Sequence, residues 1–481
     1  MKISKTHFGE AQILASGIAG ILMLLFPGVP LGATLAGIIL IWALVYELYI
    51  RTGSTDLLGR YTLLAAMLLM CAGVIVNVHY YTVVRGGTLS SPVVISDALT
   101  AWDTMESVVN GTDNPWGETV RGYGRFLAGL SYVSGVSISA FLLYNVAFVM
   151  VAIVLTGSVA EMLCGASCGP RVRSVAMLFM VLVAPFLYSG TILIKDALMC
   201  MLMALFVFSA LRLRFVLSGQ GRVRFPVVFG YCMAIVAVMA LAMLVRPNLL
   251  PFLAIGAVFV FGSRKWRPVV AGCVIVILSC AGFVLSQYWI RNAPDAVGLV
   301  RDSSTLMTYT EGRIGAFDAL TGGYDGSPWY VKLLYLPLTL AAQYLPPLPW
   351  NFTRDIVFAP TSVYARIAYG WYFVGGVTLY GLFAALRLMP QVLRRTVLYG
   401  VTCWVITAYV TVGTIPRYCL PWLPMIIPAA AWVWMTLRKT RGFRVWIAVY
   451  AVVLASGLLV CHHLQMKNNL STEELWKTES R

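Results

Sequence analysis

The run YTLLAAMLLMCAGVIVNVHYYTVV, residues 61–84, contains no Asp, Glu, Lys or Arg. At 1.5 Å of rise per residue, a helix of about 20 residues crosses a bilayer core of about 30 Å. Similar runs recur along the 481 residues, of which 60% are hydrophobic and 11% are charged. Soluble domains carry about 25% charged residues. The composition therefore predicts an all-α polytopic membrane protein, with residues 1–481 forming a single integral membrane domain.

We expect about 13 transmembrane helices. The first run lacks the small-residue cleavage signature of a signal peptide, so we count it as a span. The stretch 330–350 is apolar but holds four prolines, which favours a re-entrant or interfacial segment over a crossing. The expected spans are 11–27, 31–50, 61–84, 136–157, 173–190, 192–213, 226–245, 248–263, 268–290, 366–387, 395–413, 417–437 and 443–462.

Charge predicts the orientation of these spans. One alternate set of short loops holds 20 basic and four acidic residues, and the rest of the chain holds 15 of each sign. The net charge of +16 therefore comes from one set of loops. The positive-inside rule makes that set cytoplasmic, which places the N-terminus inside and the C-terminus outside. Because the excess charge is an orientation signal, we expect no nucleic acid partner. Short cytoplasmic loops without an appended domain favour a bacterial inner (plasma) membrane.

Two large loops, 85–135 and 291–365, then fall on the extracytoplasmic side. The first contains SDALTAWDTMESVVNG, residues 96–111, in which Ser96 or Asp97 can start a helix and Asn110-Gly111 can end it. Apolar residues recur at helical spacing and predict an amphipathic helix on the membrane surface. These residues are Ala98, Ala101, Trp102, Met105, Val108 and Val109.

Two readings of the carboxylates in this helix remain open. Asp97 can serve as a helix N-cap, and Asp103 and Glu106 can belong to a solvated face. Alternatively, a carboxylate at the outer interface can act as a general base that takes a proton from an acceptor hydroxyl. Asp97 and Asp103 lie about 120° apart around a helix axis, so they form no ready-made metal clamp on a straight helix. This leaves metal dependence open, although we do not favour an obligatory divalent metal, and we expect no other cofactor. Cys164 and Cys168 are spaced CxxxC in an expected short loop. No second Cys or His pair lies nearby, which argues against a metal site at these cysteines.

Cations at or near the outer ends of spans are candidates for binding a lipid phosphate. Arginine suits this role because its planar guanidinium binds phosphate oxygens in pairs. Charges beside spans are costly and usually serve sites, although snorkelling or a structural Lys195–Asp196 pair would also explain some of them. The candidates are Arg417, Arg246, Lys195, Arg121 and Arg125.

The layout resembles that of the GT-C glycosyltransferases, above all the protein mannosyltransferase-like and aminoarabinose transferase-like members. Four stretches carry the resemblance: residues 96–111, the return of the first loop over 114–146, SGTILIKDALM (189–199) and PRYCLPWLPMIIPAAAW (416–432). It implies a catalytic carboxylate at Asp97, with Asp103 as second candidate, and phosphate contacts by cations such as Arg417. One departure is that three spans precede the acidic loop, where many members have one.

The resemblance implies an enzyme that moves a sugar from a polyprenyl-phosphate-linked donor to a glycan or lipid acceptor during cell-surface polysaccharide biosynthesis. The expected partners are that donor, the acceptor and membrane lipid. An O-antigen-type polysaccharide polymerase or ligase would use the same carrier and the same cations. A transporter or flippase, a third class, would show matching halves with broken helices, and the sequence has no clear internal repeat.

Overall fold

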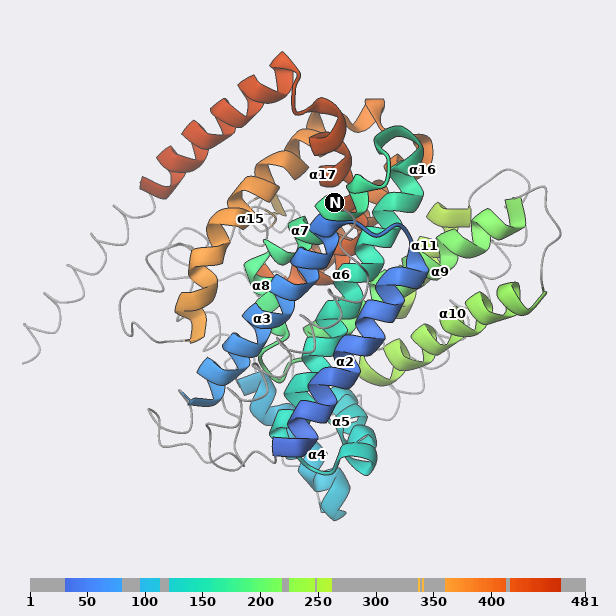
Figure 1. The fold of residues 1–481 in the computed structure, drawn as a ribbon, viewed down its shortest axis with the longest axis vertical. Helices are drawn as coiled ribbons and strands as arrows, with labels where there is room; N and C mark the ends of the chain where they lie inside the picture. The colour runs from blue at the N-terminus through green and yellow to red at the C-terminus, as the bar shows by residue number, and fades with distance from the viewer. Residues whose placement is uncertain are drawn as a thin grey trace, which may run out of the picture.

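A computed structural model describes residues 31–79, 96–112, 121–218, 225–246, 249–261, 336–337, 340, 360–411 and 416–459. Within these residues every regular element is a helix (Figure 1). Six of the described helices are long and apolar enough to cross a membrane. They cover Leu57–Val74, Ala140–Cys168, Asp196–Leu217, Phe225–Val245, Cys419–Leu437 and Arg441–Leu459.

The expected spans that fall within the described residues correspond to helical segments. Spans 11–27 and 268–290 lie outside them, as does most of the stretch 330–350. A last helix, Arg441–Leu459, follows the labelled ones. The labelled helices are α2 (Leu31–Thr52), α3 (Leu57–His79), α4 (Ser96–Asn110), α5 (Arg121–Ser134), α6 (Ile138–Cys168), α7 (Arg171–Val181), α8 (Ala184–Ser189), α9 (Asp196–Ser218), α10 (Phe225–Val245), α11 (Leu250–Phe261), α15 (Pro360–Phe383), η4 (Leu386–Leu388), α16 (Gln391–Thr411), η5 (Pro416–Trp422) and α17 (Leu423–Leu437).

The span expected at 173–190 is not one continuous helix. It is divided into α7 and α8, and Val183 between them has the extended angles φ −80° and ψ 90°. Pro185 in the first turn of α8 explains the break, because its ring lacks an N–H and clashes with the preceding turn of a helix. A proline is tolerated in the first turn, so the chain resumes a helix there.

Helix α6 forms the centre of the bundle and packs against α9, α7, α17 and α2. Its 31 residues extend over about 46 Å. Cys164 and Cys168 lie in the last turns of α6, so the prediction that they lie in a short loop is wrong. The helix instead ends at Gly169, whose φ of 70° is costly for other residues and whose N–H donates to Gly165 O.

Burial separates inner from outer helices. The apolar windows of α6 and α17 are 72% and 78% buried, whereas those of α10 and the last helix are only 11% and 6% buried. Apolar side chains all around a poorly buried helix need an apolar surrounding, which a bilayer supplies. The described helices therefore form a packed centre with lipid-facing helices outside it.

Turns that carry arginines meet at one end of the bundle, which we call the basic end. There Arg173 Nη1 on α7 donates to Ser54 O between α2 and α3, across 2.7 Å. Arg212 Nη2 on α9 donates to Thr52 O across 2.9 Å. Helices α4 and α5 lie together at the opposite end (Figure 1), which we call the α4–α5 end. Which end faces the cytoplasm remains a prediction.

Candidate functional site

Helix α4 is present where the sequence analysis expects it, from Ser96 to Asn110. Gly111, with φ 66°, ends it, and Thr112 N donates to Ser107 O across 2.9 Å, as in a Schellman motif. Of the expected apolar face, Ala98, Ala101, Trp102 and Met105 are buried, whereas Val108 and Val109 in the last turn are exposed.

The buried face of α4 is wider than expected because α5 packs closely against it. Thr104 and Ser107 are buried as well. A Cβ added at Gly124 on α5 would lie 2.9 Å from Ala101 O and 2.6 Å from Thr104 Cγ2. Glycine at position 124 therefore allows the two helices to approach.

A second glycine of α5 allows contact with α10. A Cβ at Gly122 would lie 2.6 Å from Leu244 O and 2.7 Å from Val245 O, at the carboxyl end of α10. The start of α5 thus abuts the end of α10. Arg121, the first residue of α5, and Arg246, which directly follows α10, come from these adjoining helix ends.

Between the two glycines, Tyr123 is buried and its hydroxyl donates to Asn145 Oδ1 on α6 across 2.9 Å. Asn145 Nδ2 in turn donates to Ile192 O across 2.6 Å and to Ile194 O across 3.3 Å. These carbonyls belong to the non-helical segment 190–195 that precedes α9. A hydrogen-bonded chain therefore runs from α5 through α6 to the start of α9.

The electrostatics of this chain keep Tyr123 protonated. Burial raises the pKa of Tyr123 above its usual value. The hydrogen bond with Asn145 opposes that rise, and the nearby charge of Asp196 adds to it. At neutral pH the hydroxyl is therefore a neutral donor, which suits a structural or positioning contact better than proton transfer.

Lys195 and Asp196 lie where the non-helical segment 190–195 ends and α9 begins, directly after the carbonyls that Asn145 binds. Asp196 is 3% exposed and occupies the first turn of α9, where the helix dipole favours a negative charge. Lys195 is half-buried, and its carbonyl accepts a 2.9 Å hydrogen bond from Met199 N. The pair thus has defined backbone positions at the α4–α5 end.

Arg417 lies in η5, the short helix that precedes α17. This short helix packs against α8 and α9, and its residues Cys419, Leu420 and Trp422 are buried. The Trp422 ring lies 5.0 Å from the Phe252 ring of α11. The position of Arg417 is therefore anchored by its neighbours, while its side chain lies outside the description.

The remaining predicted residues lie on α4 and α5. Asp103 and Glu106 are half-buried on α4, and Arg125 is exposed on α5. Asp97 is the second residue of α4, and the side chains of Asp97 and Arg121 lie outside the description. Among the described residues, no group of three or more His, Cys, Asp or Glu side chains could hold a metal ion.

Tyr123 and Asn145 were not among the residues predicted from the sequence. A usable signal existed for Asn145, which is an uncharged polar residue inside the apolar run SAFLLYNVAFVMVAIVL, because buried amides need hydrogen-bond partners. For Tyr123 the signal was its position between Gly122 and Gly124. Comparison of the chain with protein-family models, curated proteins and solved structures finds no match.

Proposed function

We propose that the chain is a GT-C-like glycosyltransferase of the bacterial inner membrane. It would have about 13 transmembrane helices, with the N-terminus cytoplasmic and the C-terminus and both large loops outside. It would move a sugar from a polyprenyl-phosphate-linked donor to an extracytoplasmic glycan or lipid acceptor. The observation that carries the proposal is the convergence of helix α4, which bears the carboxylates, with the backbone positions of Arg121, Arg125, Arg246 and Lys195 at one end of the bundle.

The convergence follows from three described contacts. Helix α4 packs on α5 through Gly124, and α5 abuts the end of α10, next to Arg246, through Gly122. Tyr123 connects α5 through Asn145 to the segment that ends at Lys195. Apolar helices continue from this end into the bundle, so a lipid carrier could bring its phosphate to these cations while its tail stays in the bilayer.

In the proposed reaction Asp97, with Asp103 as the second candidate, takes the proton of an acceptor hydroxyl. The hydroxyl oxygen attacks the anomeric carbon, and the bond from that carbon to the phosphate oxygen breaks. The polyprenyl phosphate leaves with the electron pair, and the sugar is transferred with inversion. Arg417, Arg246, Lys195, Arg121 and Arg125 would neutralise the charge that develops on the departing phosphate.

The experiment is mass spectrometry of surface glycans and carrier-linked lipids in a strain that lacks the gene. The strain is complemented with wild type, Asp97→Ala, Asp103→Ala or Glu106→Ala. Glu106 is the matched control, because it is a carboxylate of the same helix and, like Asp103, is half-buried. We expect loss of one sugar that wild type and Glu106→Ala restore and Asp97→Ala does not.

Other outcomes contradict the proposal in different ways. Glycans reduced to one repeat unit would indicate a polymerase, and full-length polymer left on its carrier would indicate a ligase. An unchanged glycan profile would exclude all three enzymes and favour transport. Immunoblots of the membrane fraction confirm that each variant is present in equal amount.

A further inference from the structure

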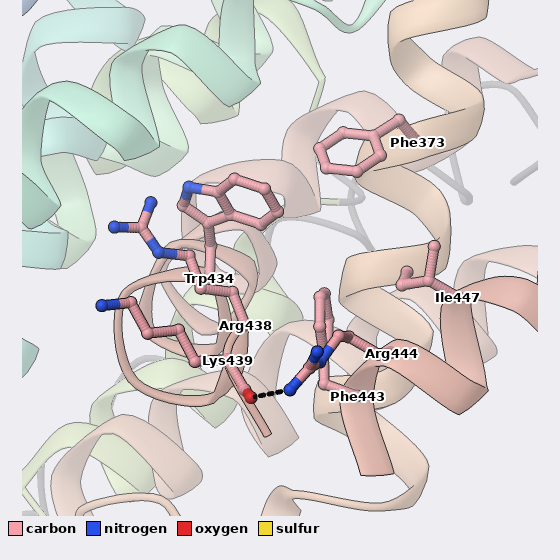
Figure 2. Close-up of a pocket in the computed structure, with 7 residues that line it drawn as sticks. All are labelled: Phe373, Trp434, Arg438, Lys439, Phe443, Arg444 and Ile447. Atoms are coloured by element: carbon pink, nitrogen blue, oxygen red, sulfur yellow. Dashed lines mark hydrogen bonds between the residues drawn. The ribbon is translucent and has the colours of Figure 1, made fainter. Parts of the chain in front are cut away.

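The basic end contains a cavity of about 430 Å³ between α15, α17 and the last helix. Figure 2 shows its seven lining residues. Four of them are apolar or aromatic and three are cationic. They are Phe373, Trp434, Phe443 and Ile447, together with Arg438, Lys439 and Arg444.

Defined contacts fix the walls of this cavity. The Trp434 ring centroid lies 5.3 Å from that of Phe373 and 6.3 Å from that of Phe443, both edge-on. Farther along the last helix, Trp446 Nε1 donates to Gly376 O across 3.0 Å, and Tyr450 Oη donates to Tyr372 O across 2.9 Å. The last helix is therefore tied to α15, although most of its surface is exposed.

The three cations lie around the turn between α17 and the last helix. Arg438 lies over the Trp434 ring, with its Cζ 5.5 Å from the ring centroid. Arg444 Nη2 donates to Lys439 O across 3.0 Å, which holds that guanidinium near the turn (Figure 2). All three side chains are exposed, and the lining contains no Asp or Glu. The cavity thus joins an apolar wall to an excess of positive charge.

The position of the cavity indicates what kind of molecule would contact both its apolar wall and its positive charge. Helix α17 and the last helix are apolar enough to span a membrane, and the cations stand where the two helices meet. That is the depth at which lipid acyl chains give way to headgroups. Basic pockets between membrane helices bind anionic lipid headgroups, and a guanidinium pairs well with phosphate oxygens.

We propose that this cavity binds an anionic phospholipid of the leaflet at the basic end. The phosphate pairs with Arg444, while the exposed Arg438 and Lys439, which point to the other side of the turn in Figure 2, add positive charge to the site. An acyl chain lies against Phe373, Trp434 and Ile447. A zwitterionic lipid would leave the excess positive charge uncompensated. A soluble phosphate would leave the aromatic wall without a partner. The site is at the opposite end from the proposed transferase centre and does not depend on that function.

The test is native mass spectrometry of the full-length protein in neutral detergent, titrated with dioleoyl phosphatidylglycerol or dioleoyl phosphatidylcholine. We expect tighter binding of phosphatidylglycerol. We also expect the double variant Arg438→Gln/Arg444→Gln to weaken that binding on the order of 25-fold, or about fivefold for each cation removed. Arg441→Gln is the matched control, because Arg441 is an exposed cation of the same region that does not line the cavity.

Equal binding of the two lipids by the wild-type protein would overturn the proposal, even if the double variant proved unstable. Unchanged phosphatidylglycerol binding in the double variant, or an equal loss in Arg441→Gln, would overturn it as well. sn-Glycerol 3-phosphate, which has the phosphate without acyl chains, should not displace the lipid at equal concentration. Displacement would show that the apolar wall contributes nothing.

Discussion

Tyr123 and Asn145 are joined by a 2.9 Å hydrogen bond that connects α5, at the α4–α5 end, to the central helix α6. Tyr123 is 5% exposed and Asn145 is fully buried. The same amide donates to the carbonyls of Ile192 and Ile194. One side chain therefore serves three partners, one on α5 and two in the segment from which α9 begins, and its loss would leave all of them without that contact.

We expect Asn145→Leu to destabilise the protein by about 2–4 kcal/mol, because each buried polar group left unsatisfied costs about 1–3 kcal/mol. Tyr123→Phe should cost less, about 1 kcal/mol, since the amide bonds to Ile192 and Ile194 remain. Unfolding in detergent, followed by circular dichroism, measures both. Tyr132→Phe, at an 86% exposed tyrosine of the same helix, should change stability by less than about 0.5 kcal/mol. Equal stability of Asn145→Leu and wild type would contradict the role assigned to this amide.

The glycines of α5 give opposite predictions. Gly122→Ala should destabilise by about 1–3 kcal/mol, since its Cβ would lie 2.6 Å from a backbone carbonyl of α10 that cannot rotate away. Gly129→Ala on the same helix should stabilise by about 0.5–1 kcal/mol, because its Cβ would meet nothing within 4 Å and alanine favours the helix. The same unfolding assay measures both variants. A gain in stability for Gly122→Ala would show that α5 does not contact α10 as described.

The helices could be predicted largely from apolar length. The ends of α4 also followed from local chemistry, since Gly111 has the positive φ that its position in the sequence indicated. The division of the chain at Leu182–Val183 was not predicted, because apolar length alone does not show that Pro185 starts a new helix. The extension of α6 to Cys168 was not predicted, because a span of about 20 residues already crosses a bilayer and length alone does not show that a helix continues beyond it.

The site was predictable only in part, for a physical reason. Charge placement beside spans indicated Lys195 and Arg246, but the contacts that position them come from distant residues. Asn145 reaches a carbonyl 49 residues farther along the chain, and hydrophobic periodicity carries no information about such a pair. The network around Arg173 is similar, since Ser54 and Glu161 approach it only after three helices have packed.

That network at the basic end yields a stability prediction. Arg173 is fully buried, and its Nη2 donates across 2.8 Å both to Tyr49 O and to Thr52 Oγ1. Its Cζ also lies 4.4 Å from the centroid of the Tyr49 ring.

We expect Arg173→Gln to destabilise by about 3–5 kcal/mol, because buried acceptors lose a charged donor that glutamine is too short to replace. Detergent unfolding measures this loss. Arg171→Gln is the control, because Arg171 is an exposed arginine two residues earlier on the same helix; it should change stability by less than about 0.5 kcal/mol. Similar losses in the two variants would mean that general positive charge, and not these hydrogen bonds, stabilises this end.

The orientation of the two ends decides whether the proposed chemistry is possible. Thr112, after α4, and Leu388, in η4, are exposed residues at opposite ends of the bundle. In a background with Cys168→Ser and Cys232→Ser, Thr112→Cys should react with a membrane-impermeant maleimide in right-side-out vesicles. Leu388→Cys should react only in inverted vesicles, since the basic end is expected to face the cytoplasm. Labelling of the parent background is subtracted. The reverse pattern would place Asp97 and Asp103 in the cytoplasm and contradict an extracytoplasmic transferase, while the described packing of the helices would stand.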